Sequence, residues 1–184
     1  MSRITDMEII TVKDKAFKPY ISEEDLQSSV EKVAAQINTD YEGSEPLFIG
    51  VLNGSFMFFS DLLKLVDLEC KVSFVKLASY EGTSTTGKVN ELIGLSESIE
   101  GQDVIIVEDI VDTGNTLVKL HDILSKGNPK SIKTATLLYK PEAYKKDHPI
   151  DYVGLEIPNA FVLGYGLDYD GLGRNLSSIY VLNE

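Results

Sequence analysis

Apolar runs of strand length alternate with amphipathic stretches along most of the chain. Residues 22–38 carry apolar side chains at helical spacing, and Ser22 and Asp25 occupy the positions of a helix-capping box. Two further helices are expected, one after the turn at Gly54 and one that opens in residues 112–116. Strands are expected at the remaining apolar runs, which are residues 46–52, 71–80, 103–109, 132–139, 151–157, 161–169 and 178–182.

This alternation indicates the fold class. Strands that alternate with helices and are apolar on both faces are typical of a parallel sheet covered on its two sides. The length of 184 residues suits one well-buried domain, and no linker, repeat or low-complexity tract divides it. We therefore predict a single α/β domain over residues 1–184, with a central, mainly parallel sheet flanked by helices and antiparallel pieces near its end.

Composition and charge narrow the classes of function. The chain has 17 Lys and Arg residues against 29 Asp and Glu residues, and the net charge of −12 leaves no general basic surface for nucleic acid. No apolar stretch approaches the roughly 18 residues of a membrane span, and the first residues lack the apolar run of a signal peptide. We expect a soluble, cytoplasmic protein with no nucleic-acid and no membrane partner.

The stretch VIIVEDIVDTGNTL, residues 104–117, concentrates the candidate chemistry. Ligands of open α/β sheets gather outside the carboxyl ends of the strands, where Glu108 and Asp109 are expected. The helix that follows can direct the backbone N–H groups of its first turn, with the positive end of its dipole, at one small anion. A monophosphate is therefore expected at this turn, which comprises Thr113, Gly114, Asn115 and Thr116.

The acidic pair needs a different part of the ligand, because carboxylates repel phosphate. Ribose hydroxyls can donate to Glu108 and Asp109, and a Mg²⁺ ion would also suit oxygen ligands. By itself an acidic pair at a strand end is more often a solvated loop or a helix cap. Kinase and dehydrogenase interpretations fit poorly, because the chain lacks GxxxxGK[ST] and its GYGLDY segment is not GxGxxG.

Residues 104–117 resemble the signature by which type I phosphoribosyltransferases bind 5-phosphoribosyl 1-pyrophosphate. Four further segments are similar to the hypoxanthine-guanine phosphoribosyltransferases, in the same order and at similar spacing: VLNGSFMFFSDL (51–62), SYEGTSTTG (79–87), LLYK (137–140), and DYVGLEIPNAFVLGYGLDY (151–169) followed by Arg174. The similarity covers roughly residues 8–182. It implies the type I phosphoribosyltransferase fold, with a small hood region contributed by the N-terminal segment and roughly residues 155–184.

The resemblance also implies an activity. Enzymes of this family salvage purines by Mg²⁺-dependent transfer of the phosphoribosyl group to hypoxanthine or guanine, which gives IMP or GMP and pyrophosphate. By matching positions, Glu108 and Asp109 hold the ribose hydroxyls and Asp112 is the candidate general base at purine N7. A carboxylate there can also stabilise an oxocarbenium-like centre. The alternative role for Asp112 is a helix N-cap, and one carboxylate could serve both purposes.

The purine site is assigned by the same resemblance. Lys140 matches the lysine that donates to the 6-oxo group, and its ammonium cannot accept a hydrogen bond from the amino group of adenine. Phe161 matches the residue that stacks on the purine, Val162 the residue whose backbone meets the base edge, and Leu167 the opposite wall. From composition alone, these three residues would be assigned to a strand core.

Asp168 matches the acid associated with magnesium, together with Glu108 and Asp109, and Arg174 matches a pyrophosphate contact. Ser79 and Tyr80 begin a loop that is expected to close over the reaction and exclude water. One departure stands out. Many family members carry Lys or Arg where this chain has Asn53, so we expect a pyrophosphate turn that lacks one positive charge and relies on the backbone of Gly54.

Alternatives to this assignment remain open at the level of the sequence. A xanthine-preferring enzyme would share every feature above, because backbone groups read the 2-position of the base. A phosphoribosyltransferase-like regulator that binds nucleic acid would need a basic face, which the net charge disfavours. The expected partners are the purine base, 5-phosphoribosyl 1-pyrophosphate and further copies of the chain, as a homodimer or homotetramer.

Overall fold

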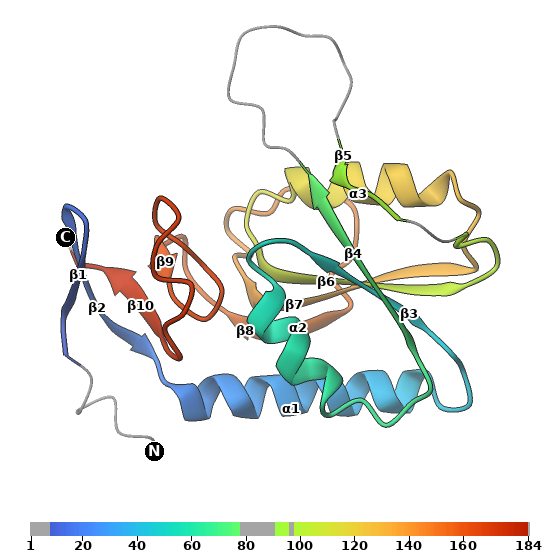
Figure 1. The fold of residues 1–184 in the computed structure, drawn as a ribbon, viewed down its shortest axis with the longest axis horizontal. Coiled ribbons are helices and arrows are strands. Elements are labelled where there is room, and N and C mark those ends of the chain that lie inside the picture. Colours follow the sequence, from blue (N-terminus) through green and yellow to red (C-terminus); the bar gives the residue numbers. More distant parts are fainter. Residues whose placement is uncertain (1–7, 78–90, 96–97, 184) are drawn as a thin grey trace, which may run out of the picture.

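The computed structural model describes residues 8–77, 91–95 and 98–183, which form two sheets and three helices. The larger sheet has the strand order β5-β4-β3-β6-β7-β8 and the smaller one the order β1-β2-β10-β9 (Figure 1). The helices are α1 (Glu23–Asp40), α2 (Phe56–Leu63) and α3 (Asn115–Ser125). The strands are β1 (Ile10–Val12), β2 (Lys15–Ile21), β3 (Leu47–Val51), β4 (Lys71–Leu77), β5 (Glu91–Ile93), β6 (Asp103–Val111), β7 (Ser131–Tyr139), β8 (Tyr152–Glu156), β9 (Val162–Leu163) and β10 (Ile179–Leu182).

The larger sheet confirms the predicted parallel architecture. Strands β4, β3, β6, β7 and β8 run parallel, and β5 adds an antiparallel edge. Alternate side chains of β6 enter two different cores, because Ile105 packs with residues of α1 and α2 whereas Ile106 packs with residues of α3. Helices α1 and α3 lie on opposite sides of the sheet (Figure 1). Burial on both faces explains why these strands are continuous apolar runs.

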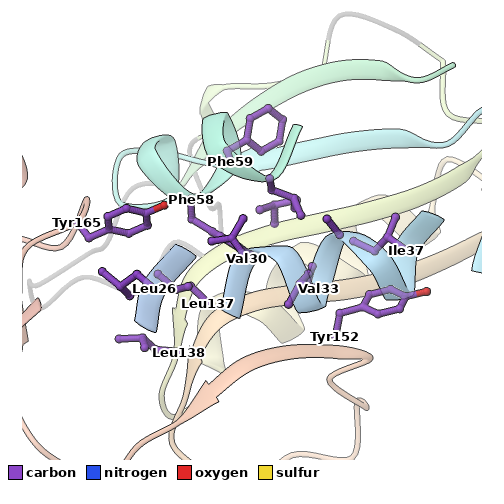
Figure 2. Close-up of a cluster of buried hydrophobic side chains, with 14 of the residues drawn as sticks. Leu26, Val30, Val33, Ile37, Phe58, Phe59, Leu137, Leu138, Tyr152 and Tyr165 are labelled. Atoms are coloured by element: carbon purple, nitrogen blue, oxygen red, sulfur yellow. The ribbon is translucent and has the colours of Figure 1, made fainter. Parts of the chain in front are cut away.

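Helix α1 covers one face of this sheet through a stripe of apolar residues at helical spacing. Figure 2 shows Leu26, Val30, Val33 and Ile37 of α1 in one cluster with side chains from α2 and β7. The helix begins where the sequence predicts, because the Ser22 hydroxyl accepts a hydrogen bond from the Asp25 amide at 3.1 Å. In the described residues, no helix is both long and apolar enough to cross a bilayer.

The smaller sheet, with the loops between its strands, is called the hood below. It joins the two ends of the chain, since β10 pairs antiparallel with β2 on one side and with β9 on the other. The hood lies beside the larger sheet, near the start of α1 (Figure 1). The strand expected at 161–169 is wrong beyond β9, because the chain turns at Gly164–Gly166 with positive φ at all three residues.

Candidate active site

Strand β6 carries the acidic pair past the end of its neighbour β3. The pairing of β3 with β6 stops at Gly50 and Val107, whereas the pairing of β6 with β7 continues to Val111 and Tyr139. The expected end of this strand at residue 109 was therefore too early. Glu108 and Asp109 thus lie where β7 still pairs with β6 and where the pairing of β3 with β6 has ended.

The surroundings of Glu108 and Asp109 disfavour the charged form of both carboxyl groups. Glu108 is buried, and its burial, followed by the charge of Asp109, raises the pKa of Glu108 well above the ordinary range. Burial also raises the pKa of the partly exposed Asp109 to about 6, although backbone hydrogen bonds and the charge of Arg174 oppose this shift. Hydrogen-bond donors or a cation would therefore stabilise the charged pair.

The turn after β3 packs directly on Asp109. A Cβ atom added to Gly54 would lie 1.6 Å from a carboxylate oxygen of Asp109, so only glycine fits between the turn and the acid. A Cβ added to Gly166 would in turn lie 2.0 Å from the carbonyl oxygen of Gly54. Three segments from distant parts of the chain therefore meet at Gly54: the turn after β3, strand β6 and the turn after β9.

The predicted phosphate turn opens helix α3. Its N-cap is Gly114, with φ of 76° and no side-chain cap, and an added Cβ would lie 2.3 Å from the ring of Tyr144. Helix α3 therefore begins without a capping side chain, and the alternative role of Asp112 as the N-cap is wrong. Glu108 and residues 110–117 line a cavity of about 100 Å³ that contains the predicted phosphate turn, with Thr113, Asn115 and Thr116 exposed.

Asp112 pairs with Lys140 instead. Lys140 Nζ lies 2.7 Å from Asp112 Oδ2, and the exposed fractions of the two side chains are 8% and 43%. The Lys140 amide also donates to the Val111 carbonyl at 3.0 Å, which continues the pairing of β6 with β7. The ends of two adjacent parallel strands therefore present an ammonium and a carboxylate side by side.

The hood contributes the predicted purine-site residues. The Phe161 ring is 45% exposed, and the centres of the Phe17 and Tyr169 rings lie 6.2 Å and 5.8 Å from its centre. Val162 and Leu167 are buried in the core cluster shared with α1 and α2. The strand-core alternative is therefore confirmed for Val162 in β9, whereas Leu167 lies beyond the end of that strand. A stacking role for Phe161, and the roles of Val162 and Leu167 at the base edge, stay predictions.

Arg174 and Asp168 are bound to each other. One guanidinium nitrogen lies 2.6 Å from an Asp168 carboxylate oxygen, and another donates to the Gly166 carbonyl at 2.7 Å. The second Asp168 oxygen accepts a hydrogen bond from the Gly171 amide at 2.7 Å. Among the side chains described in residues 8–77, 94–95 and 98–183, no three His, Cys, Asp or Glu gather closely enough to hold a metal ion alone.

Two residues near the site, Lys76 and Tyr144, were not predicted from the sequence, and two predicted residues are not described by the structure. Ser79 and Tyr80 fall outside the described residues, so their predicted role in a closing loop stays a prediction. Lys76 lies beside Asn53, with Lys76 Nζ 3.2 Å from Asn53 Oδ1, and Tyr144 packs against the phosphate turn. Neither Lys76 nor Tyr144 belongs to a sequence motif, because each reaches the site through the sheet or through a loop that follows it.

A parallel sheet, an acidic pair on a central strand and a glycine-containing turn at a helix N-terminus are features of α/β proteins that bind phosphorylated sugars or nucleotides. The chain belongs to the family of the phosphoribosyl transferase domain, whose family model matches residues 22–170. The predicted fold class, that of the type I phosphoribosyltransferases, is thereby confirmed.

The chain is similar in sequence and in fold to proteins named as hypoxanthine or hypoxanthine-guanine phosphoribosyltransferases. The chain is 43% identical over 166 residues to the hypoxanthine-guanine phosphoribosyltransferase of Bacillus subtilis, a match that covers 90% of this chain and 92% of that protein. It is also 43% identical to the bifunctional protein TilS/HprT of Listeria monocytogenes, but spans only 26% of that longer protein. A crystal structure of a hypoxanthine-guanine phosphoribosyltransferase from Bacillus anthracis matches with a TM-score of 0.83 at 42% identity, over 91% of this chain and 97% of that one. The hypoxanthine phosphoribosyl transferase of Trypanosoma cruzi matches with a TM-score of 0.84 at 38% identity, over 95% of both chains.

Proposed function

We propose that the protein transfers the 5-phosphoribosyl group of 5-phosphoribosyl 1-pyrophosphate to hypoxanthine and guanine, giving IMP or GMP and pyrophosphate. The observation that carries this proposal is the Lys140–Asp112 pair, at 2.7 Å, beside the buried acidic pair of β6. The names of the 43% identical relatives support the same activity.

The Lys140–Asp112 pair matches one edge of a 6-oxopurine. In the tautomer that carries its proton on N7, such a base presents an acceptor, O6, next to a donor, N7–H. The Lys140 ammonium can donate to O6 while the Asp112 carboxylate accepts from N7–H. Adenine would place an amino donor against the ammonium, and a site built for hydrogen bonds discriminates strongly against such a mismatch.

The phosphoribosyl group fits the remaining features. We assign its 5′-phosphate to the turn of residues 113–116, where backbone N–H groups and the dipole of α3 favour an anion. We assign its 2′ and 3′ hydroxyls to Glu108 and Asp109, because burial raises the pKa of both carboxyl groups and hydroxyl donors would stabilise their charged form. The exposed ring of Phe161 is free to stack on the base.

The donor set suits Mg²⁺ only if the substrate supplies part of the coordination. The described carboxylates do not form a three-ligand cluster, and Mg²⁺ commonly binds one or two carboxylates together with substrate phosphates and water. Asp168, Glu108 and Asp109 are the residues that we expect to hold it. When bound, the ion neutralises charge on the pyrophosphate leaving group.

The transfer breaks the bond between C1′ and the pyrophosphate oxygen and forms the bond between C1′ and N9 of the purine. The N7 proton passes to Asp112, which is positioned by Lys140 before the base arrives. The Asp112 charge can also stabilise the electron-poor C1′ centre during the transfer. Arg174 is suited to the pyrophosphate oxygens once it leaves Asp168.

Initial rates with hypoxanthine, guanine, xanthine and adenine, each with 5-phosphoribosyl 1-pyrophosphate and Mg²⁺, test this function. Hypoxanthine and guanine should react and adenine should not, and a chelator should abolish product formation. Adenine as the fastest substrate would overturn the proposal. A preference for xanthine would instead support a xanthine-preferring phosphoribosyltransferase, because the Lys140–Asp112 pair does not distinguish xanthine from the other 6-oxopurines. Strong retention on a polyanion column without nucleotide formation would instead favour a nucleic-acid-binding regulator.

A cytoplasmic location and a homodimer or homotetramer stay predictions.

A further inference from the structure

Lys76 places a positive charge beside the turn that contains Asn53. Its ammonium donates a hydrogen bond to the Asn53 amide oxygen across 3.2 Å. Strands β3 and β4 pair in register through Val51 and Val75, and the Leu52 amide donates to the Val75 carbonyl at 2.8 Å. The sheet itself therefore holds the ammonium against the turn, because Lys76 directly follows the last residue of β4 that pairs with β3.

This turn is also the part of the chain that touches the acidic pair. Gly54, the residue after Asn53, packs on the Asp109 carboxylate so closely that no side chain fits between them. Lys76 and Asp109 thus flank the same short turn from two different strands. A phosphorylated group bound over the turn would lie between a fixed cation and the carboxylates that hold the ribose.

The other cations of the site are already paired. Lys140 is bound to Asp112, and Arg174 is bound to Asp168 and to a backbone carbonyl. By contrast, the partner of Lys76 is a neutral amide, and no carboxylate whose side chain is described, in residues 8–77, 94–95 and 98–183, lies within ion-pair distance of it. An ammonium has three donors, so two remain for a ligand.

We propose that Lys76 binds the pyrophosphate group of 5-phosphoribosyl 1-pyrophosphate and supplies the positive charge that Asn53 does not bring to this turn. This inference rests on the proposed function and names a residue for one part of its substrate. Asn53 acts as a positioning residue, because its amide oxygen holds the ammonium at the turn without neutralising it.

Two substitutions that together move the positive charge from position 76 to position 53 test this role. Lys76→Met keeps the length of the side chain and removes the charge, and Asn53→Lys in the Lys76→Met background returns the charge to the other side of the same contact. Lys71→Met is the matched control, because Lys71 is an exposed lysine at the opposite end of β4. For each variant we would measure kcat, the Michaelis constants of both substrates, and the inhibition constant of pyrophosphate.

Lys76→Met should raise the Michaelis constant for 5-phosphoribosyl 1-pyrophosphate and the inhibition constant of pyrophosphate by about tenfold, the size of one charge-assisted hydrogen bond. The constant for hypoxanthine should stay unchanged. The double variant should recover most of the loss. Asn53→Lys alone should give no improvement, because it places two ammonium groups at one contact.

Unchanged constants in Lys76→Met, or an equal rise for both substrates, would overturn the role of Lys76, as would a double variant that recovers nothing. If the wild type forms no nucleotide from any of the four bases, the proposed function fails instead. Calorimetric titration of wild type and Lys76→Met with 5-phosphoribosyl 1-pyrophosphate would then still test Lys76, since equal affinities would exclude its contact with the pyrophosphate group.

Discussion

The Lys140 ammonium and the Asp112 carboxylate lie 2.7 Å apart, each directly beyond the end of its strand. The register that pairs Val111 with Tyr139 brings them together, because Asp112 and Lys140 are the next residues on two adjacent parallel strands. The buried lysine and the more exposed aspartate thus hold each other in place before any base binds. Under the proposed function, the proton acceptor and the donor to the 6-oxo group are thus already in position, which lowers the cost of ordering them during the reaction.

Asp112→Asn tests the proton acceptor. The amide oxygen of Asn can still accept a hydrogen bond from Lys140, but the side chain loses its charge and its basicity. We expect kcat with hypoxanthine to fall by about 100-fold or more, the usual scale of general acid–base catalysis. Thermal unfolding provides the control and should change little, because α3 is not capped by Asp112. Unchanged turnover in a folded variant would contradict the assignment.

Gly114→Ala tests the phosphate turn. The substitution meets both a positive φ of 76° and the Tyr144 ring, so the turn must shift. Gly43→Ala is a matched control, because Gly43 has φ of 72° with open space around its Cβ position. Both variants should unfold at a lower temperature, but only Gly114→Ala should raise the Michaelis constant for 5-phosphoribosyl 1-pyrophosphate several-fold. Equal Michaelis constants in the two variants would argue against phosphate binding at this turn.

Asp109→Asn should make the protein more stable and less active. The folded-state pKa of Asp109, about 6, lies above its ordinary value of 3.8, so the folded state binds this proton more tightly than the unfolded state. The stability contributed by this group is complete below pH 3.8 and is lost as the pH rises through 6. An amide needs no proton, so the variant should gain about 1 to 2 kcal/mol at neutral pH, or a few degrees in Tm.

Thermal unfolding of wild type and Asp109→Asn from pH 4.5 to 8 measures this effect. The difference in Tm should grow up to about pH 7 and then level off. Asp67→Asn, which alters an exposed carboxylate away from the site, should follow the wild type throughout. A variant that is less stable than the wild type at pH 8 would mean that Asp109 makes stabilising interactions in the free protein.

The strands and helices of the larger sheet could be predicted because local pattern determines them. Residues 104–107 and 47–51 are apolar throughout because both faces of the sheet are covered, and the spacing of apolar residues in α1 matches its buried stripe. The signature in residues 104–117 placed the acidic pair and the predicted phosphate turn on neighbouring elements. These features depend on residues close together in the sequence.

The hood and the side-chain pairs could not be predicted in this way. Strand β2 has the sequence KAFKPYI, in which two lysines and Pro19 interrupt the apolar pattern expected of a strand. Its pairing partner β10 comes from the other end of the chain. The GYG segment continues an apolar run and yet turns, since its backbone packs on Gly54. The contact of Lys76 with Asn53 and that of Lys140 with Asp112 depend on strand register, which the sequence pattern does not determine.

The central claim is that the Lys140–Asp112 pair selects a 6-oxopurine as the acceptor of the phosphoribosyl group. The most direct measurement is a competition in which wild type and Lys140→Gln receive equal concentrations of hypoxanthine and adenine with 5-phosphoribosyl 1-pyrophosphate and Mg²⁺. The wild type should form IMP almost exclusively. Lys140→Gln should lower the ratio of IMP to AMP at least about tenfold, because a glutamine amide can either donate to a 6-oxo group or accept from a 6-amino group. AMP as the main product of the wild type, or a ratio that Lys140→Gln leaves unchanged, would contradict the claim.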